Sequence, residues 1–183
     1  MGKKETAWER IEGASPLSLV IGRDTDDDRF VGGLLDELAP ELEGAGIIPV
    51  RFSCPGDMDI MSFWKSLFER IMTDCRDCFD EYDKVAVEEQ VEDYRNALEE
   101  GQVYLCITSI LDILKESGRK ILLIVEDFER FFDRYGLSDI NVFHSFTGHV
   151  ALVTVSSENL DSLGKRRYGS AYFCNQFVTV DYS

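Results

Sequence analysis

The sequence predicts an α/β fold: a three-layer sandwich in which helices cover both faces of a mainly parallel, five-stranded sheet. Short apolar runs alternate along the chain with longer segments whose apolar residues recur at helical spacing. Such alternation is typical of parallel sheets built from strand–helix–strand units. The chain has 183 residues, of which 44% are hydrophobic, and this size suits a single domain spanning residues 1–183.

The first half of the chain predicts two strands and the helix between them. Residues 3–13 suit a short amphipathic lead-in, and residues 17–21 suit a buried strand. After an acidic turn, residues 30–42 carry an apolar stripe at helical spacing. Residues 47–52 predict the second strand, in which Pro49 lacks a backbone donor and therefore favours the edge of the sheet.

The middle of the chain is helical and becomes strongly acidic. Residues 58–79 carry a broad apolar stripe, and residues 103–115 predict a further apolar helix. Between them, residues 80–100 are acidic with sparse apolar side chains, which is typical of an exposed helical excursion. We therefore expect an acidic helical insertion over residues 74–100.

Three more strands are predicted in the second half. Residues 121–125 form a wholly apolar run that ends at Glu126 and Asp127. The carboxyl end of a central strand is where ligands bind in open α/β sheets. The remaining elements are, in order, helical turns over 128–132 and 137–146 and strands over 150–155 and 176–182.

Composition restricts the classes of partner. Acidic residues outnumber basic ones by 35 to 19, a formal net charge of −16, which repels nucleic-acid phosphates. The compact basic cluster Lys165–Arg167 is expected to be a solvated loop after a helix, so we do not expect nucleic-acid binding. The sequence shows neither a bilayer-spanning run nor a signal-peptide core, which favours a cytoplasmic protein without a membrane partner. The five cysteines, including Cys75 and Cys78 in a helical pattern, predict no disulfide framework and no zinc site.

The order of these elements resembles the ATPase domain of the AAA+/STAND group of P-loop NTPases, bacterial relatives of the archaeal origin-recognition ATPases. Residues Gly46–Val50 match that family's second strand, Arg119–Phe131 resemble its Walker B strand, and Ser170–Val180 resemble its closing segment. The family's fourth strand ends in a polar sensor, here Ser156 or Ser157. The resemblance implies the sheet order 5-1-4-3-2. The family's C-terminal lid or winged helix has no counterpart in these 183 residues.

The phosphate-binding loop departs from the family's motif. A working loop has the pattern G-x-x-x-x-G-K-[ST], in which backbone N–H groups surround phosphates, the Lys contacts the terminal phosphates and the hydroxyl binds magnesium. Counting from Gly22, Asp27 replaces the second glycine, Asp28 the lysine and Arg29 the hydroxyl. The loop's four aspartates would face a triphosphate, and each such like-charge contact costs on the order of a few kcal/mol.

Two interpretations of the loop aspartates follow. Carboxylates at a helix N-terminus accept hydrogen bonds from its free N–H groups and interact favourably with its dipole. The loop's own carboxylates can therefore take the place of phosphates at these N–H groups. Alternatively, Asp24, Asp26 and Asp28 match the first three ligand positions of a calcium-binding loop. Arg29 and Leu35 stand where that loop requires a glycine and a bidentate glutamate, so we predict no metal.

The Walker B acids are also altered. In the family the first acid holds magnesium and the second polarises the attacking water, and here the order is Glu126 and then Asp127. We predict a degenerate ATPase-like domain that works as a scaffold or regulatory module. We expect it to have no enzymatic activity and to need no cofactor. Its partner would be another protein or further domains of a longer chain, bound through residues 74–100 or through apolar surface that the C-terminal segment would otherwise cover. The alternative is an ATP-binding switch with an atypical loop, in which Glu126 and Asp127 handle magnesium and Ser156 senses phosphate.

Overall fold

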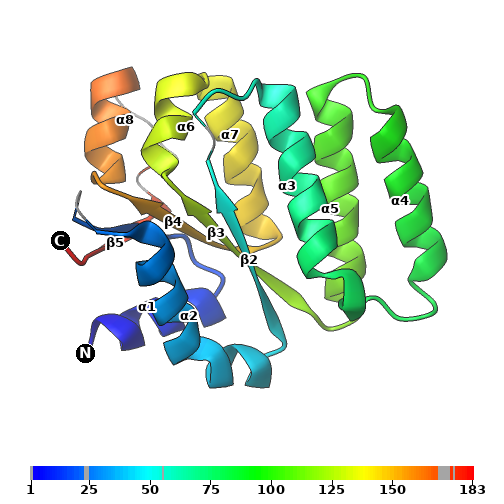
Figure 1. The fold of residues 1–183 in the computed structure, drawn as a ribbon, viewed down its shortest axis with the longest axis horizontal. Helices are drawn as coiled ribbons and strands as arrows, with labels where there is room; N and C mark the ends of the chain where they lie inside the picture. Colours follow the sequence, from blue (N-terminus) through cyan, green and yellow to red (C-terminus); the bar gives the residue numbers. More distant parts are fainter. Residues whose placement is uncertain (1, 23–24, 55, 169–173, 175) are drawn as a thin grey trace.

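Five parallel strands form the sheet, in the order β2-β3-β4-β1-β5 (Figure 1). The computed structural model describes all residues except 1, 23–24, 55, 169–173 and 175, and it describes no side chain at 27, 137, 144 and 147. Counted from the other edge, this order is the predicted 5-1-4-3-2, which is therefore confirmed. The strands are β1 (Leu17–Val20), β2 (Ile47–Ser53), β3 (Lys120–Glu126), β4 (Ala151–Ser156) and β5 (Val178–Asp181).

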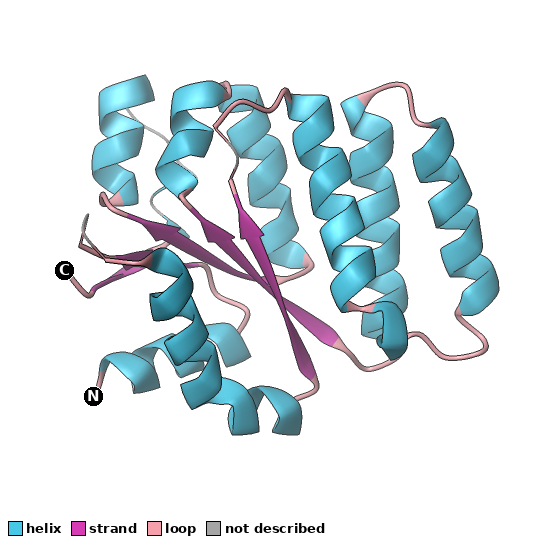
Figure 2. Ribbon diagram, in the orientation of Figure 1, coloured by secondary structure: helices cyan, strands magenta, loops and turns pink. Residues whose placement is uncertain are grey.

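Helices occupy both faces of the sheet, as the alternating pattern predicts (Figures 1 and 2). The helices α1 and α2 pack on one face, while α3, α5, α6, α7 and α8 lie on the other. Helix α4 is the outermost element and packs on α5. The helices are α1 (Lys3–Glu12), α2 (Asp27–Gly44), α3 (Ile60–Asp74), α4 (Lys84–Asn96), α5 (Glu100–Glu116), α6 (Phe128–Arg134), α7 (Leu137–Ser145) and α8 (Leu160–Tyr168), with short 3₁₀ turns η1 (Arg76–Cys78) and η2 (Phe146–Gly148).

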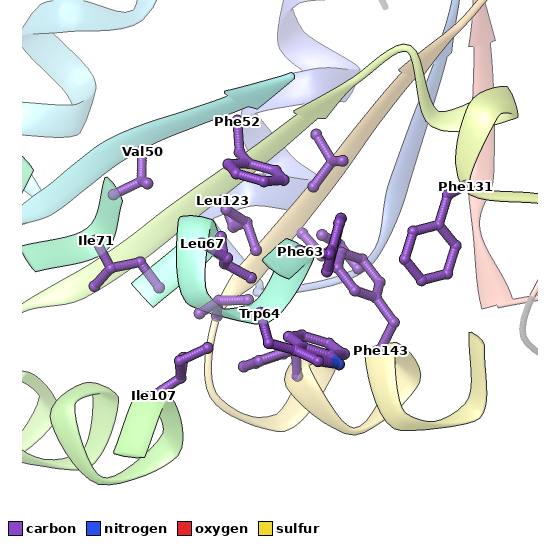
Figure 3. Close-up of a cluster of buried hydrophobic side chains, with 14 of the residues drawn as sticks. Val50, Phe52, Phe63, Trp64, Leu67, Ile71, Ile107, Leu123, Phe131 and Phe143 are labelled. Carbon is purple, nitrogen blue, oxygen red and sulfur yellow. The ribbon is translucent and has the colours of Figure 1, made fainter. Parts of the chain in front are cut away.

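Aromatic side chains fill the larger of the two cores, between the sheet and the helices α3, α5, α6 and α7 (Figure 3). Phe63 is fully buried at its centre and meets the rings of Phe52, Trp64 and Phe131 edge-on, with centroids 5.3, 5.1 and 5.1 Å away. Such edge-to-face pairs contribute about 0.5–1.5 kcal/mol beyond the area that they bury. This packing fixes α6, and with it the carboxyl end of β3.

Two buried hydroxyls interrupt the apolar interior of the sheet. Ser18 of β1 and Thr154 of β4 lie opposite each other in the strand register, and both are fully buried. Neither hydroxyl oxygen has a hydrogen-bond partner in the part of the chain that the structure describes. A buried polar group without a partner costs roughly 1–3 kcal/mol, so this pair is a local weakness of the sheet.

The observed helices and strands confirm one sequence prediction and correct two others. Pro49 does lie on an edge strand, since β2 ends the sheet. The basic cluster Lys165–Arg167 was wrongly expected in a loop: it forms the last turn of α8, where cations favour the helix dipole. The apolar stripe over 58–79 is not one helix, because α3 ends at Asp74 and a 3₁₀ turn follows.

The acidic segment forms η1 and α4 and stands away from the sheet. None of the residues of α4 is buried, although Val87, Val91 and Tyr94 pack against the core from its inner side. The ring of Tyr94 stacks on that of Phe68 at 4.2 Å, which holds the helix against α3. Its role as an interaction surface stays a prediction.

Candidate functional site

The sequence-predicted site residues converge at the carboxyl edge of the sheet. Gly22 follows β1, Glu126 ends β3, and Ser156 ends β4. Because β1 and β3 both neighbour β4 and all run parallel, their carboxyl ends lie side by side. The structure thus brings together the acidic turn after β1, the acids at the end of β3 and the serines at the end of β4, which the sequence predicts as a remnant phosphate loop, Walker B acids and sensors.

The acidic turn caps its own helix, as one of the two interpretations predicts. The carboxylate of Asp26 accepts a hydrogen bond from the backbone N–H of Arg29 at 3.2 Å, which places Asp26 at the N-cap of α2. The N–H of Thr25 donates to the carbonyl of Gly22 at 2.8 Å. Asp24 and the side chain of Asp27 lie outside the described part of the chain.

Arg51, in the edge strand β2, joins Asp28 at the start of α2 to Glu126 at the end of β3. Its Nη2 lies 2.8 Å from Oδ1 of Asp28 and 2.5 Å from Oε1 of Glu126, and its Nε donates to the same Glu126 oxygen at 2.7 Å. Glu126 is well buried, with 10% of its side chain exposed, whereas the side chain of Asp28 is 87% exposed. The contact with Glu126 is therefore the stronger of the two, since exposed ion pairs contribute only about 0–1 kcal/mol.

The charge of Arg51 is stabilised by its two neighbours. Partial burial acts to lower the pKa of Arg51, but hydrogen bonds and charge from Glu126, and then from Asp28, outweigh it and raise that pKa above its ordinary value. The guanidinium therefore stays protonated, and its positive charge is balanced by the two carboxylates that it contacts. Arg51 was not predicted as a site residue; the available signal was a cation inside the otherwise apolar strand of residues 47–52.

Asp127 is held in a strained backbone position by neighbours on both sides. Its backbone adopts the left-handed helical conformation, with φ 52° and ψ 36°, at the N-cap of α6. Its Oδ2 accepts a hydrogen bond from the hydroxyl of Ser53 at 3.1 Å, and its Oδ1 lies 3.5 Å from Nη2 of Arg130. A left-handed conformation is rare outside glycine and is most accessible to Asn and Asp, which explains an acid at this position without reference to a ligand.

The sensor-like serines also have internal partners. The hydroxyl of Ser156 is buried and donates to the carbonyl of Glu158 at 2.6 Å. The hydroxyl of Ser157 donates to Oε1 of Glu129 at 2.8 Å. Within the described residues, no group of three or more His, Cys, Asp or Glu side chains is arranged to hold a metal ion.

A cavity of about 590 Å³ lies beside this edge, on the β5 side of α2. Its lining includes two cations, Lys4 and Arg29, two acids, Asp26 and Glu37, and the rings of Phe30 and Tyr182. These rings meet edge-on with centroids 5.0 Å apart. The volume is within the range of about 300–1,000 Å³ that small-molecule sites occupy.

Comparison with known proteins places the fold. No family model matches the sequence, and no curated protein matches it. Among solved structures, the ORC2 protein of Aeropyrum pernix in its ADPNP–ADP complexes resembles the chain with a TM-score of 0.65 and 10% sequence identity, over 98% of this chain and 47% of that one. The ADP form of that protein resembles the chain with a TM-score of 0.62 and 11% sequence identity, over 97% of this chain and 46% of that one.

The fold is AAA+-like. Drosophila ORC bound to poly(dA/dT) DNA and Cdc6 also resembles the chain, with a TM-score of 0.53 and 13% identity over 97% of this chain and 27% of that one. The chain spans less than half the length of each of these structures. In the described part of the chain, no helix has both the length and the apolar character that a bilayer crossing requires.

Proposed function

We propose that this domain is a degenerate AAA+-like ATPase domain that has lost nucleotide binding and acts as a scaffold or regulatory protein-interaction module. The observation that carries the proposal is the bridge that Arg51 makes between Asp28 and Glu126. Asp28 stands in the position of the Walker A lysine. A carboxylate there, already paired to an internal cation, does not supply the positive charge that terminal phosphates require.

The other site groups support the same proposal. Magnesium in a Walker site would need the Walker B acid, but Glu126 is buried and bound twice by Arg51. The sensor-like hydroxyls of Ser156 and Ser157 donate to groups of the chain itself. The residues present therefore do not fit Mg·ATP at this site, and we derive no catalytic step through it.

Measurement of ATP hydrolysis tests the loss of enzymatic function. We expect no rate above buffer for the chain, and the same result for Asp127→Asn. A measurable rate that Asp127→Asn abolishes would contradict the proposal, because it would give the Walker B remnant a catalytic role.

The interaction role is tested separately with the acidic segment. Partners captured by the intact chain are compared with those captured after residues 74–100 are replaced by a short linker, and the mass of each chain in solution is measured. Loss of a partner on replacement supports an acidic interaction surface, with binding that weakens as salt rises. An unchanged partner set and an unchanged monomeric mass would contradict an interaction role for this segment.

A second candidate function is the ATP-binding switch with an atypical loop. The cavity beside α2 favours it, since Lys4 and Arg29 could meet phosphates while Phe30 and Tyr182 offer ring faces or edges to a base. In that case the nucleotide would lie on the β5 side of the helix and not in the remnant loop. The variant Arg29→Glu would then abolish nucleotide binding, and Arg51→Met would leave it intact.

A further inference from the structure

A second cavity lies away from the remnant site, where the strands β2, β3 and β4 begin. It measures about 200 Å³ and is lined by residues from α1, α5, η2 and the starts of these strands. Its apolar lining consists mainly of side chains that are otherwise almost completely buried: Ile11, Ile47, Leu111, Ile121 and Val150. The remnant phosphate loop lies at the opposite, carboxyl edge, so the cavity is not part of that site.

The polar lining of this cavity is cationic. Lys115, Arg119 and Lys120 lie at its rim, and all three are exposed. None of them forms an ion pair within the described part of the chain. Their charges are therefore available to the carboxylates of a bound partner. His149 also lines the cavity, but its Nδ1 lies 3.2 Å from Oδ1 of Asp112 and is thereby engaged.

The size of the cavity restricts its occupant. Small-molecule and cofactor sites usually measure about 300–1,000 Å³, so a cavity of about 200 Å³ is suited to one apolar side chain. The cationic rim requires negative charge on either side of that side chain. An apolar anchor flanked by acidic residues meets both conditions, because the anchor is desolvated in the cavity while the flanking carboxylates contact the rim.

We propose that this cavity is a docking site for an acidic peptide segment of a partner protein, anchored by one large aliphatic or aromatic side chain. The inference deepens the proposed interaction role and rests on it, but it does not depend on the loss of nucleotide binding. The cationic rim also contributes to selectivity, because the net charge of −16 repels acidic chains from the molecule as a whole while the rim attracts them locally.

The test is a selection of random peptides displayed on phage against the whole chain, followed by fluorescence polarisation with the enriched peptide. We expect enriched peptides to share a Leu, Ile or Phe flanked by Asp or Glu, with affinity that falls as salt rises. The double variant Arg119→Glu with Lys120→Glu should weaken binding at least tenfold. The control for each single reversal, Arg119→Glu or Lys120→Glu, is Arg95→Glu, which reverses one exposed cation on α4 and should change the affinity less than twofold.

A cavity-filling variant separates the anchor from the charges. Gly148 lines the cavity, and a Cβ added there would meet no atom within 4 Å, so Gly148→Leu adds a side chain beside the cavity without a clash at its Cβ. We expect Gly148→Leu to weaken peptide binding at least tenfold while the thermal unfolding temperature stays unchanged. Nucleotide titration of the same variants shows separately whether the remnant site behaves as proposed.

Three results would overturn the proposal. The first is that no acidic peptide with an apolar anchor is enriched. The second is that the enriched peptide binds the charge-reversed or cavity-filled variant as tightly as the unchanged chain. The third is that octanoate, a free carboxylate with an apolar body, binds saturably while no peptide does, which would assign the cavity to a small molecule.

Discussion

Replacing Arg51 with methionine isolates the ion pair on which the account of the remnant site depends. Methionine keeps much of the aliphatic volume and removes the charge and the donors. The variant leaves Glu126 buried, with 10% of its side chain exposed, and without the cation that lies 2.5 Å away. Asp28 loses a partner as well, but its side chain is 87% exposed and water replaces that contact.

The expected loss of stability lies between two limits. Removing one partner of a fully buried ion pair costs about 3–5 kcal/mol, and exposed pairs contribute about 0–1 kcal/mol. Since 25% of the Arg51 side chain is exposed, we expect a loss of about 2 kcal/mol for Arg51→Met after solvent screening. The double variant with Glu126→Gln should regain at least about 1 kcal/mol relative to additivity, because the unpaired charge is gone.

Urea unfolding of the unchanged chain, Arg51→Met, Glu126→Gln and the double variant measures the coupling energy between Arg51 and Glu126. The matched control is Arg70→Met, whose partner Asp74 lies 2.8 Å away on the same helix and whose side chain is 47% exposed; it should lose no more than about 0.5 kcal/mol. A loss no larger than that of Arg70→Met, or additive effects, would refute the reasoning.

Four other outcomes are expected. Asp127→Asn should change the unfolding free energy by no more than about 1 kcal/mol, because Asn also adopts the left-handed conformation seen there; Asp127→Val, measured in the same urea series, should lose more. Thr154→Val should stabilise the chain by about 1 kcal/mol, since it removes an unpaired buried hydroxyl, and a loss would contradict this. Under native conditions a thiol reagent should modify Cys78, which is partly exposed, well before Cys54, where burial raises the pKa to about 12. Hydrogen bonds from backbone and side chain lower the pKa of Asp59, so its contribution to stability should be complete above about pH 4 and lost as pH falls further; Asp59→Asn should remove this acid dependence.

Much of the fold could be predicted because its signals are local. The strands β1, β3 and β4 are buried on both faces, so their sequences are mostly apolar instead of alternating between apolar and polar residues. Pro49 indicated an edge strand through its missing backbone donor. The order of the strands came from the family resemblance, since apolar periodicity alone does not specify which strands are neighbours.

The helix α8 illustrates where local signals fail. It spans Leu160–Tyr168 and buries Leu160 and Leu163, so its apolar stripe is short and most of its residues are polar. Its basic cluster therefore resembled a solvated loop. The stabilising features are the dipole and local ion pairs such as Lys165 with Asp161, which a hydrophobic pattern does not reveal.

The candidate site was only partly predictable for a related reason. The capping role of Asp26 follows from its place before a helix, which is local information. The bridge by Arg51 depends on a residue 75 positions away along the chain, which becomes its neighbour only when β2 pairs with β3. A cation in an apolar edge strand indicates that some acid lies near, but only the folded sheet identifies Glu126.

Isothermal titration of the chain with ATP in the presence of magnesium tests most directly whether the remnant site has lost its nucleotide. We predict no saturable heat at millimolar ATP, for the unchanged chain and for Arg29→Glu alike. A dissociation constant below about 100 µM, corresponding to more than about 5 kcal/mol of binding free energy, would contradict it.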